Sequence, residues 1–566
     1  MLRSACLSLQ RVSSLRACTN RLNTLNRLNR LNRLNTLNTL NRLNTLNSLH
    51  RSLSTRAQTS NTSKDTDAIL KDDEELQTAR VAPFSFSYKS LRENLQTYYE
   101  SFERRHNLNA IEMLREIERL DGRIVNLRKQ VSKFYIERKA LTEQLLREKS
   151  KENKALLAAQ LQKLKSDLLD SESVLTEIED TVKSYVKLMP NLVSKTSPDK
   201  EPALVKYICP PPDVMPDPPI RTDDEFTQLP NYDDFSERDH VSIAMELGML
   251  DLQTASKVSG HAFYYLANDG VLLETALVQY ALDKARQHGF TIMMPPTIMK
   301  REYIQACGFR PKDTNGEQQI YNIELAGGQP PTEYVEDEPS RQKIVPKLAL
   351  TGTAEISLAS WGANKMFKYQ DCPIKFAGVN RSYRAEAGAR GKRDRGLFRV
   401  HEFTKVELFT WVPSGQAVGR ETTTSDDMLE QIHELQQEIV TGLGLYSRVL
   451  DMPVSDLGNS AYKKYDIEAW MPGRNNWGEI TSASNCIDYQ ARRMNTKVQT
   501  AAGSKSGAFA HTLNGTAMAV PRVIVALIEN YYDKERNAVW IPHVLRPYMG
   551  GRAWITKATL PETYSI

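Results

Sequence analysis

One segment of the chain gathers side chains that could bind a nucleotide. Residues 380–409 read NRSYRAEAGARGKRDRGLFRVHEFTKVELF. Within it, the guanidinium of Arg384 offers a planar fork for a phosphate group, and the carboxylate of Glu386 can accept a hydrogen bond from an amino group. The turn at residues 388–396 adds basic side chains that suit a polyanion: Arg390, Lys392, Arg393 and Arg395.

The residues that flank this turn have the pattern of two β-strands. An apolar stretch at residues 374–377 leads toward Tyr383, and a second β-like run extends from Leu397 to Phe409. An ordinary exposed basic hairpin would have the same local pattern. We interpret His401, inside the second run, as a packed strand residue rather than a general base. Two strands joined by the basic loop would bring four side chains onto one sheet: Arg384, Glu386, Phe403 and Glu407.

Several other chemistries are excluded. The sequence has no GxxxxGKS/T phosphate loop, which argues against a Walker-type ATPase. It has no HExxH motif, and its cysteines form no CxxC pair, which argues against structural zinc and a disulfide scaffold. No predominantly apolar run approaches the ~18 residues of a membrane span, so no membrane partner is predicted. The scattered cysteines are interpreted as core or neutral positions: Cys6, Cys18, Cys209, Cys307, Cys372 and Cys486.

Charge is distributed unevenly along the 566 residues. The whole chain carries 74 basic and 69 acidic residues, a formal net charge of +5. Residues 1–64 hold ten Arg, one Lys and no carboxylate, so the remainder has 63 basic against 69 acidic residues, a net charge of −6. A basic coat over the whole protein is therefore excluded, and any contact with RNA must come from local patches.

The amino-terminal segment has the composition of a mitochondrial presequence, being rich in Arg, Ser and Leu and free of acids; we assign residues 1–57 to it. A three-residue repeat with Leu at every third position runs from Arg21 to about Leu49. Such a Leu stripe slips about 60° per repeat around a helix, so the tract is interpreted as mostly disordered. A low-complexity expansion is the alternative for the repeat. The pattern Arg51-Ser52-Leu53-Ser54 predicts cleavage near Ser54 and import into the mitochondrial matrix.

After a polar linker at residues 58–82, residues 83–192 are predicted to be helical. Two runs of apolar residues alternate spacings of three and four, one from Ile117 to Leu145 and one from Leu157 to Tyr185. Such spacing predicts two coiled-coil helices, and the polar stretch at residues 147–154 would reverse the chain between them. The expected structure is an antiparallel two-helix arm.

The charges of this arm favour its first helix and its tip as a phosphate-binding surface. Residues 123–154 contain ten Lys or Arg and four Asp or Glu, whereas residues 155–189 contain four Lys and six Asp or Glu. The alternative is a solvated coiled coil that dimerises or spaces domains. We predict RNA contacts for five basic residues: Arg128, Lys129, Lys149, Lys151 and Lys154.

A Pro-rich connector is predicted at residues 193–225. Beyond it, residues 226–566 mix short β-like runs with longer helical patterns. This length, about 340 residues, is enough for one large α+β domain with a sizeable core.

The segment at residues 380–409 resembles motif 2 of class II aminoacyl-tRNA synthetases in their seryl form, where FRxEAG precedes GLxRxHxFxKVE. Pro295-Pro296 resembles motif 1, and NGTAMAVPR at residues 514–522 resembles motif 3. With the arm, the resemblance covers roughly residues 83–555 and implies a catalytic domain built on an antiparallel β-sheet flanked by helices. Three blocks similar to the seryl enzymes lie between motifs 1 and 3: TGTAE at 351–355, GNSAYKKYDIEAW at 458–470 and GEITSASNCIDYQARR at 478–493.

The resemblance implies a two-step reaction with ATP. Serine and ATP form seryl-adenylate and pyrophosphate, and the seryl group then moves to the terminal ribose of tRNA(Ser). Arg384 would bind the α-phosphate, Phe403 and Arg522 would sandwich the adenine, and Arg522 would reach the γ-phosphate. Glu386 would meet the adenine amino group in a pocket lined by Val400. The implied catalytic residues are Arg384, Glu479 and Arg522, and the implied ATP set is Arg384, Ala385, Glu386, Val400, Phe403, Glu479, Ile480, Thr481, Ser482 and Arg522.

The same resemblance implies that Glu479 and Ser482 hold Mg²⁺, a hard cation that prefers oxygen ligands. It also implies a homodimer that meets at the motif 1-like segment. A site that pairs the hydroxyl of serine would reject analogues that lack it. The implied serine contacts are Thr353, Ala354, Glu355, Arg384, Glu407 and Thr516.

This sequence departs mildly from the family pattern. Thr516 stands where Ser is usual and keeps a hydroxyl. Pro521 precedes Arg522 where Gly is usual and could shift the start of a helix, because proline fixes φ near −65°. No catalytic charge is lost. The other departures are Ala385, Thr481 and Ala483.

Three other functions compete with this interpretation. A catalytically inactive synthetase-like mitochondrial RNA-binding protein would be expected to lack Arg384, Glu479 or Arg522, and all three are present. A coiled-coil adaptor would have no reason to carry the motifs in order. An amino-acid:carrier-protein ligase, a relative of these synthetases, tends to lack the helical arm.

Overall fold

The computed structural model describes residues 88–210, 239–309, 319–324, 347–386, 396–415 and 423–558. These all belong to one of the two units into which the chain divides, Leu76–Ile566. The predicted presequence with its cleavage site near Ser54, the linker, and residues 211–238 lie outside the described residues. The basic loop side chains of motif 2 also lie outside them: Arg390, Lys392, Arg393 and Arg395.

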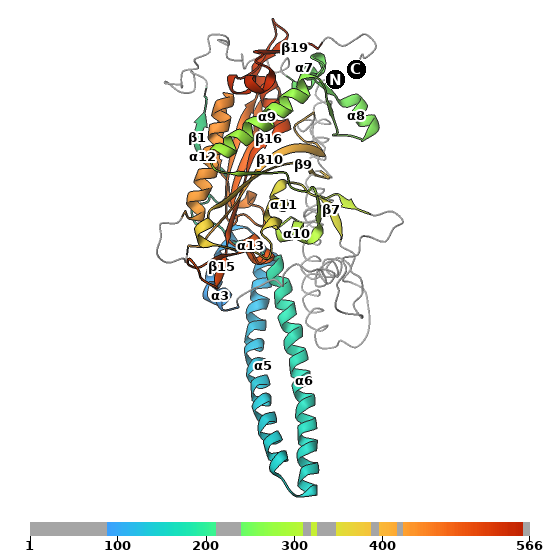
Figure 1. Cartoon of the computed structure of the whole chain (residues 1–566), viewed down its shortest axis with the longest axis vertical. Coiled ribbons are helices and arrows are strands. Elements are labelled where there is room, and N and C mark those ends of the chain that lie inside the picture. Colours follow the sequence, from blue (N-terminus) through green and yellow to red (C-terminus); the bar gives the residue numbers. More distant parts are fainter. Residues whose placement is uncertain are drawn as a thin grey trace, which may run out of the picture. The chain divides into compact units, whose positions relative to one another are not determined.

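Two long helices lie side by side in the amino-terminal part (Figure 1). Helices α5 (Leu108–Arg147) and α6 (Lys151–Leu188) are joined by a turn at residues 148–150. Their facing residues, such as Ile124 and Val182, form an apolar cluster with Phe102 of α4 (Leu95–Arg104). A short α3 (Tyr88–Glu93) precedes α4. The predicted antiparallel two-helix arm is confirmed.

Hydrogen bonds at the ends of the helices hold this hairpin together. Asn107 and Ser150 cap α5 and α6, each by accepting a hydrogen bond from a backbone amide three residues on. At the tip, the carboxylate of Glu148 accepts hydrogen bonds from the amides of Ser150 and Lys149, at 2.9 and 2.8 Å. These bonds stabilise the charged form and lower the pKa of Glu148.

The carboxyl-terminal part is built on an eight-stranded sheet with the strand order β1-β11-β12-β13-β16-β10-β9-β4. All neighbouring strands are antiparallel except β9 and β4, which are parallel. Strand β1 lies within the predicted Pro-rich connector, so part of that segment forms an edge of the sheet. The strands are β1 (Ala203–Ile208), β4 (Thr291–Met293), β9 (Ile374–Tyr383), β10 (Glu402–Val412), β11 (Ser447–Asp451), β12 (Lys463–Met471), β13 (Asn476–Asn485) and β16 (His511–Ala519).

Helices pack against both faces of this sheet (Figure 1). Helices α9 (Asp269–Gln287), α12 (Ser425–Leu443) and α14 (Val520–Tyr531) share one core with Val406 and Leu408 of β10. Helices α10 (Arg301–Ala306), α11 (Ala354–Trp361) and α13 (Tyr489–Met494) share a second core with Phe409 and Trp411. Successive strand residues point to opposite faces, so β10 separates the two cores. The predicted α+β domain with an antiparallel sheet flanked by helices is confirmed.

Shorter elements complete the domain. They include α7 (His240–Glu246), α8 (Leu252–Val258), and the paired strands β2 (Leu250–Asp251) and β3 (Tyr265–Leu266). No helix among the described residues is long and apolar enough to cross a membrane. Three small sheets are β5 (Ile298–Lys300), β7 (Leu348–Leu350) and β6 (Asn322–Ile323); β17 (Tyr532–Asp533), β18 (Ala538–Trp540) and β19 (Trp554–Thr556); and β15 (Gly507–Phe509), β14 (Lys497–Gln499) and β8 (Met366–Phe367).

Three side chains tie the base of the arm to the sheet domain. Asn191, just after α6, donates hydrogen bonds of 2.8 Å to the carbonyls of Ser460 and Cys486. Arg493 of α13 donates hydrogen bonds to the carbonyls at the end of α6, those of Val186, Lys187 and Met189. Burial lowers the pKa of Arg493, and that of Arg105, to about 10. Arg105, after α4, donates to the carbonyls of Asn191, Leu457, Gly458 and Ala461.

Candidate active site

The hairpin of β9 and β10 sets the first wall of the site. The two strands pair from Tyr383 opposite Glu402 onward, so the predicted strand pair on either side of the basic loop is confirmed. Phe403, Lys405 and Glu407 alternate along β10 and therefore share one face of the sheet. Polar groups thus occupy the loop end of that face.

Arg384 follows the end of β9 directly. Its amide donates a hydrogen bond of 2.9 Å to the carbonyl of His401, and Nδ1 of His401 lies 2.9 Å from the carbonyl oxygen of Arg384. The ring of His401 also packs on Phe263, with 5.1 Å between the ring centres. His401 therefore fixes the backbone where the two strands separate. The guanidinium carbon of Arg384 lies 5.3 Å from the centre of the Phe403 ring.

Charges from four elements converge around Arg384. Burial lowers the pKa of Arg384, and the neighbouring guanidinium of Arg522 lowers it further. The carboxylates of Glu386, Glu479 and Glu407 oppose both effects. The structure therefore brings together β10, β13, α14 and the end of β9 around one half-buried guanidinium, although these residues lie far apart in the sequence.

Arg522 and Glu479 form the second wall. Nη1 of Arg522 lies 3.2 Å from Oε2 of Glu479 and donates to its carbonyl at 3.0 Å. The guanidinium of Arg522 also lies 4.8 Å from the ring centre of Phe398, and that of Arg474 lies 3.4 Å from the same ring centre. Burial opposes ionisation of Glu479, but nearby cations, Lys464 first and then Arg522 and Arg384, bring its pKa below the ordinary value.

Arg522 stands in the first turn of α14, which begins at Val520 with Pro521 in that turn. Proline is tolerated there because its missing amide would have no partner within the helix. The helix begins two residues before Arg522, and Pro521 fits within its first turn.

The carboxylate of Glu386 is engaged in an ion pair. Its Oε2 lies 2.9 Å from Nε of Arg399, a residue of the motif 2 segment to which the sequence assigned no role. Glu386 also has a positive φ of 43°, a backbone conformation that costs energy for residues with a side chain. A ligand amino group at Glu386 would therefore share this carboxylate with Arg399.

Oxygen atoms that could hold a cation lie on β12 and β13. Asp466 stands opposite Ser482 in the register of these strands, and Glu479 lies on the same stretch of β13. Burial raises the pKa of Asp466 to about 7. The ammonium of Lys464, whose Nζ lies 2.7 Å from Oδ2 of Asp466, opposes this rise, and the carboxylate of Glu479 adds to it. Among the described residues, no three His, Cys, Asp or Glu side chains are grouped to hold a metal. The donors fit a cation that takes its other ligands from a substrate.

A second group of polar side chains surrounds Glu407, on the same face of the sheet. Oε2 of Glu407 lies 2.5 Å from Nζ of Lys405 and accepts a hydrogen bond of 3.3 Å from Thr353. Thr353 is the residue that caps α11. Thr516 lies opposite Glu407 in the register of β10 and β16 and is also buried. Carboxylate and hydroxyl groups here could bind an ammonium and a hydroxyl group.

Glu355 joins this group from α11. Oε1 of Glu355 accepts hydrogen bonds from Gln490 at 2.7 Å and Asn514 at 3.0 Å. Burial, and then the nearby carboxylate of Glu407, raise the pKa of Glu355 to about 7. An incoming ammonium group would offset both effects and favour the charged carboxylate.

Some of the residues predicted to contact ligands have side chains that are buried or already bonded within the protein. Ile480 is buried in the main core, and the hydroxyl of Thr481 donates to the carbonyl of Thr516. The amide of Ala385 donates to the carbonyl of Gln319 at 3.2 Å. Val400 is buried just before β10, and Ala354 is buried at the start of α11.

Several site residues were missed by the sequence reasoning. Lys405 could have been found, because it lies two residues before Glu407 on a strand and must share its face. The others reach the site through contacts between distant segments, which local spacing does not reveal. They are Phe398, Arg399, Lys464, Asp466, Arg474, Gln490 and Asn514.

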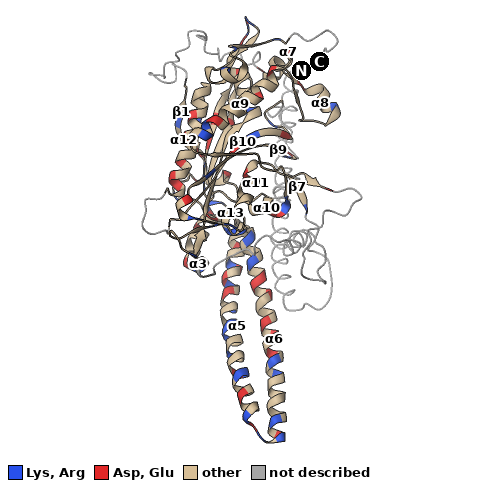
Figure 2. Cartoon of the chain, in the orientation of Figure 1, with Lys and Arg blue, Asp and Glu red and all other residues tan. Residues whose placement is uncertain are grey.

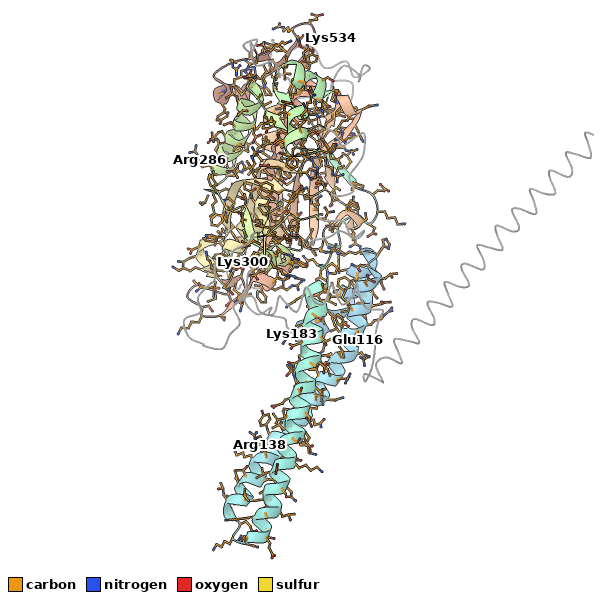
Figure 3. The ribbon with its side chains drawn as sticks, turned by 90° about the vertical axis from the view of Figure 1, so that its right-hand side faces the viewer. Glu116, Arg138, Lys183, Arg286, Lys300 and Lys534 are labelled. Atoms are coloured by element: carbon orange, nitrogen blue, oxygen red, sulfur yellow. The ribbon has the colours of Figure 1, made fainter. Side chains whose placement is uncertain are left out.

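The predicted RNA-binding residues of the arm are not all alike. Arg128 donates to Glu179 across the hairpin, at 2.6 and 3.1 Å, whereas the other four are exposed lysines. Lys and Arg gather on α5 and at the tip, and Asp and Glu are frequent along α6 (Figure 2). Figure 3 shows the side chains of both helices, with Glu116, Arg138 and Lys183 labelled. The lysines are Lys129, Lys149, Lys151 and Lys154.

Two family descriptions match this chain. Residues 339–531 match the class II core domain of tRNA synthetases (G, H, P, S and T), and residues 86–193 match the seryl-tRNA synthetase N-terminal domain. The seryl-tRNA synthetase of Pyrococcus horikoshii, solved in complex with ATP, superposes with a TM-score of 0.69 and 29% identity, over 84% of this chain and 100% of that one.

Curated relatives agree with these matches. The mitochondrial serine–tRNA ligase of Saccharomyces cerevisiae is 41% identical over 475 residues, which is 83% of this chain and 96% of the relative. That of Schizosaccharomyces pombe is 46% identical over 312 residues, 55% of this chain and 59% of the relative. The serine–tRNA ligase of Treponema denticola is 33% identical over 82% of this chain and 98% of its own length. This chain belongs to the seryl-tRNA synthetase family.

Proposed function

We propose that this chain is a serine–tRNA ligase that activates serine with ATP and transfers it to mitochondrial tRNA(Ser). One observation carries the proposal: a guanidinium–carboxylate cluster lies beside a group of buried carboxylates and hydroxyls suited to an ammonium-bearing ligand, with Arg384 near both. Serine–tRNA ligase relatives at 33–41% identity over nearly their whole length support the same activity. Nothing in the cluster favours an inactive RNA-binding protein, because Arg384, Glu479 and Arg522 form a charged network.

In the activation step, a carboxylate oxygen of serine attacks the α-phosphorus of ATP, the bond to the bridging oxygen breaks, and pyrophosphate leaves. Arg384 would bind the α-phosphate and offset the negative charge that develops there. Arg522 would leave Glu479 in part to contact the γ-phosphate and the adenine, whose other face would lie on Phe403. Glu386 would accept the adenine amino group, and Val400 would line that pocket.

Serine would bind in the pocket of Thr353, Glu355, Glu407 and Thr516. Its ammonium group would lie between the two carboxylates, and a hydroxyl of the pocket would pair with the substrate hydroxyl. Because Lys405 already neutralises part of the charge of Glu407, the pocket would hold one added cation without leaving a buried charge unpaired. Alanine would leave these polar groups without partners, which disfavours it.

Mg²⁺ would be held by Glu479 and Ser482 together with phosphate oxygens of ATP. It would neutralise charge on the triphosphate during the departure of pyrophosphate. The carboxylate of Glu479 also forms an ion pair with Arg522.

In the transfer step, a hydroxyl of the terminal ribose of tRNA attacks the carbonyl carbon of seryl-adenylate, and AMP leaves. The arm would hold the tRNA through phosphate contacts from Lys129, Lys149, Lys151 and Lys154, with Arg128 held back by Glu179. Such contacts position an RNA without reading its sequence. We assign the arm to residues 83–192, a connector to 193–225 and the catalytic domain to 226–566.

A homodimer would form at the segment that resembles motif 1. Strand β4 is the edge of the large sheet, and Ile292 and Met294 beside it are 40% and 84% exposed. An exposed apolar edge strand is commonly buried in an interface, and a second copy of the chain would bury this one. The carbonyl of Pro296 accepts a hydrogen bond of 2.7 Å from Ser357 of α11, which links this edge to the serine pocket. Light scattering of the wild type and Met294→Asp tests this, and a wild-type monomer would contradict it.

The enzyme would act in the mitochondrial matrix after cleavage of the presequence near Ser54. Relatives in Saccharomyces cerevisiae and Schizosaccharomyces pombe carry mitochondrial names, which supports the organelle. Amino-terminal sequencing of the organellar protein tests the predicted start near Ser54, and a start at residue 1 would contradict it.

The decisive experiment is ATP–pyrophosphate exchange with a panel of amino acids, followed by charging of mitochondrial tRNA. We expect exchange with serine and charging of tRNA(Ser). Exchange with another amino acid, or none with any, would overturn the proposal.

A further inference from the structure

A basic hollow lies beside the small sheet of β15, β14 and β8. It has a volume of about 400 Å³, and its lining includes Lys365, Lys497 and Lys505 but no carboxylate. In the described segments, no ion pair joins these three lysines to an acid, whereas Lys405 and Lys463 of the large sheet each have one. Within the described part of the chain, the hollow thus has three positive charges without an ion-paired acid. The remaining lining residues are Asn364, Met366, Asn495, Ser506 and Gly507.

The backbone fixes the positions of these lysines. The amide of Lys497 donates a hydrogen bond of 2.9 Å to the carbonyl of Lys365, next to the parallel pairing of β8 and β14. Asn364 and Asn495 both have a left-handed backbone, with φ of 59° and 51°, where the chain enters these strands. A Cβ at Gly507 would come within 2.7 Å of the sulfur of the lining methionine. The hollow therefore depends on ordered strands rather than on a loose surface loop.

The chemistry of the lining suits an RNA backbone. Lys365 and Lys505 are exposed, so their charges can reach a ligand. Nζ of Lys365 lies 3.3 Å from the ring centre of Trp361, whose side chain is 40% exposed. Lysines bind phosphate, amide and hydroxyl groups bind ribose, and an exposed aromatic ring beside a cation is a feature of RNA-binding surfaces.

Helix α13 connects the hollow to the arm. Arg493 of this helix holds the last carbonyls of α6, and Lys497 follows the end of the helix by three residues. In Figure 1, α13 and β15 lie near the base of α5 and α6. An RNA held along the arm would therefore meet a second set of positive charges in a fixed position relative to the base of the arm.

We propose that the hollow of Lys365, Lys497 and Lys505 binds backbone phosphates of the tRNA that the arm holds. The inference rests on the proposed function for the identity of the RNA. The hollow would not read the sequence of the RNA. It would fix the angle of the RNA relative to the catalytic domain, so its loss would raise KM for tRNA and leave amino-acid activation unchanged.

The test compares two triple variants of the full-length enzyme. The first changes Lys365, Lys497 and Lys505 to Gln. The control changes three exposed lysines elsewhere to Gln, and so alters net charge equally: Lys200, Lys257 and Lys557.

We expect serine-dependent ATP–pyrophosphate exchange to be equal in wild type and both variants. In the hollow variant, KM for tRNA should rise about 10-fold at ~0.15 M salt, and the slope of log affinity against log salt should fall by about 2. The control should match wild type. Equal tRNA kinetics in both variants would overturn the inference. Wild-type exchange and charging separately report the proposed function, whose failure would appear before any variant is compared.

A footprint identifies the ligand directly. Acetylation of Lys505 and Lys365, followed by mass spectrometry, is compared with no addition, with tRNA, with inorganic phosphate and with ATP. Protection by tRNA alone supports the inference. Equal protection by phosphate or ATP would show a general anion site and overturn it, and absence of protection by tRNA would overturn it as well.

Discussion

The active site and the arm use the same kinds of charged residue in opposite ways. Around Arg384 the charged groups are buried or half-buried, groups of opposite sign lie close together, and several have shifted pKa values. On the arm, Lys149, Lys151 and Lys154 are exposed to solvent. Burial strengthens electrostatic interactions, whereas exposed charges are screened by water and salt. A charge in the active site should therefore matter far more than one on the arm.

The two regions also differ in what positions them. The arm is fixed by contacts that repeat along two neighbouring helices, and its base is bonded to the sheet domain. The active site depends on β10, β13 and α14 meeting through long-range pairing. Changes at the arm should therefore affect tRNA alone, and changes at the site should affect both half-reactions.

The largest effect is expected from Arg384→Ala. This change removes the phosphate partner of the reacting group and leaves Glu479 and Glu407 with less neutralisation. Loss of one preorganised charge of this kind costs about 10²-fold or more in rate, so ATP–pyrophosphate exchange should fall at least that far. The rate of serine-dependent ATP–pyrophosphate exchange, measured for wild type and variant, tests this prediction.

Arg138→Ala on the arm is the matched control, because it removes an exposed guanidinium from α5. It should change exchange by less than about 2-fold, as exposed charges contribute little. Exchange near wild type in Arg384→Ala would show that Arg384 does not bind the reacting phosphate.

Shortening the arm should affect the other half-reaction. Replacing residues 128–174 by a short Gly/Ser turn keeps the apolar cluster at the base, including Ile124 and Ile178. Exchange should stay within a few-fold of wild type, because the removed residues contact none of the site. Charging, measured as kcat/KM for tRNA, should fall about 10²-fold as phosphate contacts are lost.

Two outcomes would change this picture. If the shortened enzyme charges tRNA normally, the arm is a spacer or a dimerisation element. If it also loses exchange, the arm supports the catalytic domain through its base, where Asn191 donates a hydrogen bond to the carbonyl of Cys486, inside the segment at residues 478–493.

The same contrast shows how far the sequence could predict the structure. The arm repeats one short rule, apolar residues at spacings of three and four, so its helices and turn were predictable. The strand pair of motif 2 was predictable from alternation, which placed Phe403 and Glu407 on one face. The bonds of Gln490 to Glu355, 135 residues away, and of Arg522 to Glu479 come from the packing of distant segments. No local spacing encodes them.

The family resemblance predicted the ligand contacts of these residues but not the contacts they make within the protein. It placed Arg522 on adenine, whereas here Arg522 contacts Glu479 and Phe398. It placed Glu386 on the adenine amino group, whereas here Glu386 pairs with Arg399. These ion pairs compensate charges that lie partly out of water, a requirement that a motif does not express.

An intermediate effect is expected from pH, through Glu355. Burial and Glu407 raise its pKa to about 7, so at pH 6 most of its carboxyl groups are protonated. A protonated carboxyl binds ammonium poorly, so KM for serine should rise about 10-fold between pH 8 and pH 6. Serine binding near pH 7 should also release a proton, which calorimetry in buffers of different ionisation enthalpy measures.

The sign for stability is the opposite. The folded state binds this proton more tightly than the unfolded chain, whose Glu has a pKa near 4.5. The contribution of Glu355 to the free energy of unfolding is therefore largest at low pH and falls as pH rises from 4.5 to about 7. Glu355→Gln should weaken serine binding and remove its pH dependence over this range. Unchanged pH dependence in this variant would assign the titration to another group.

The smallest effect should come from the tip of the arm, where Lys149, Lys151 and Lys154 are changed together to Gln. These side chains are exposed, and the capping bonds of Glu148 and Ser150 that shape the turn use other atoms. The hairpin should therefore keep its structure, and exchange should equal that of wild type. Each lost phosphate contact lowers the salt slope by roughly 1. Three weak, screened contacts should thus raise KM for tRNA about 3–10-fold at ~0.15 M salt, and the difference should widen at lower salt.

The same substitutions on α6, at Lys163, Lys165 and Lys183, remove equal charge from the more acidic helix and serve as the control. If both variants weaken tRNA binding equally, the net charge of the protein attracts the RNA, and the lysines at the tip make no specific phosphate contacts.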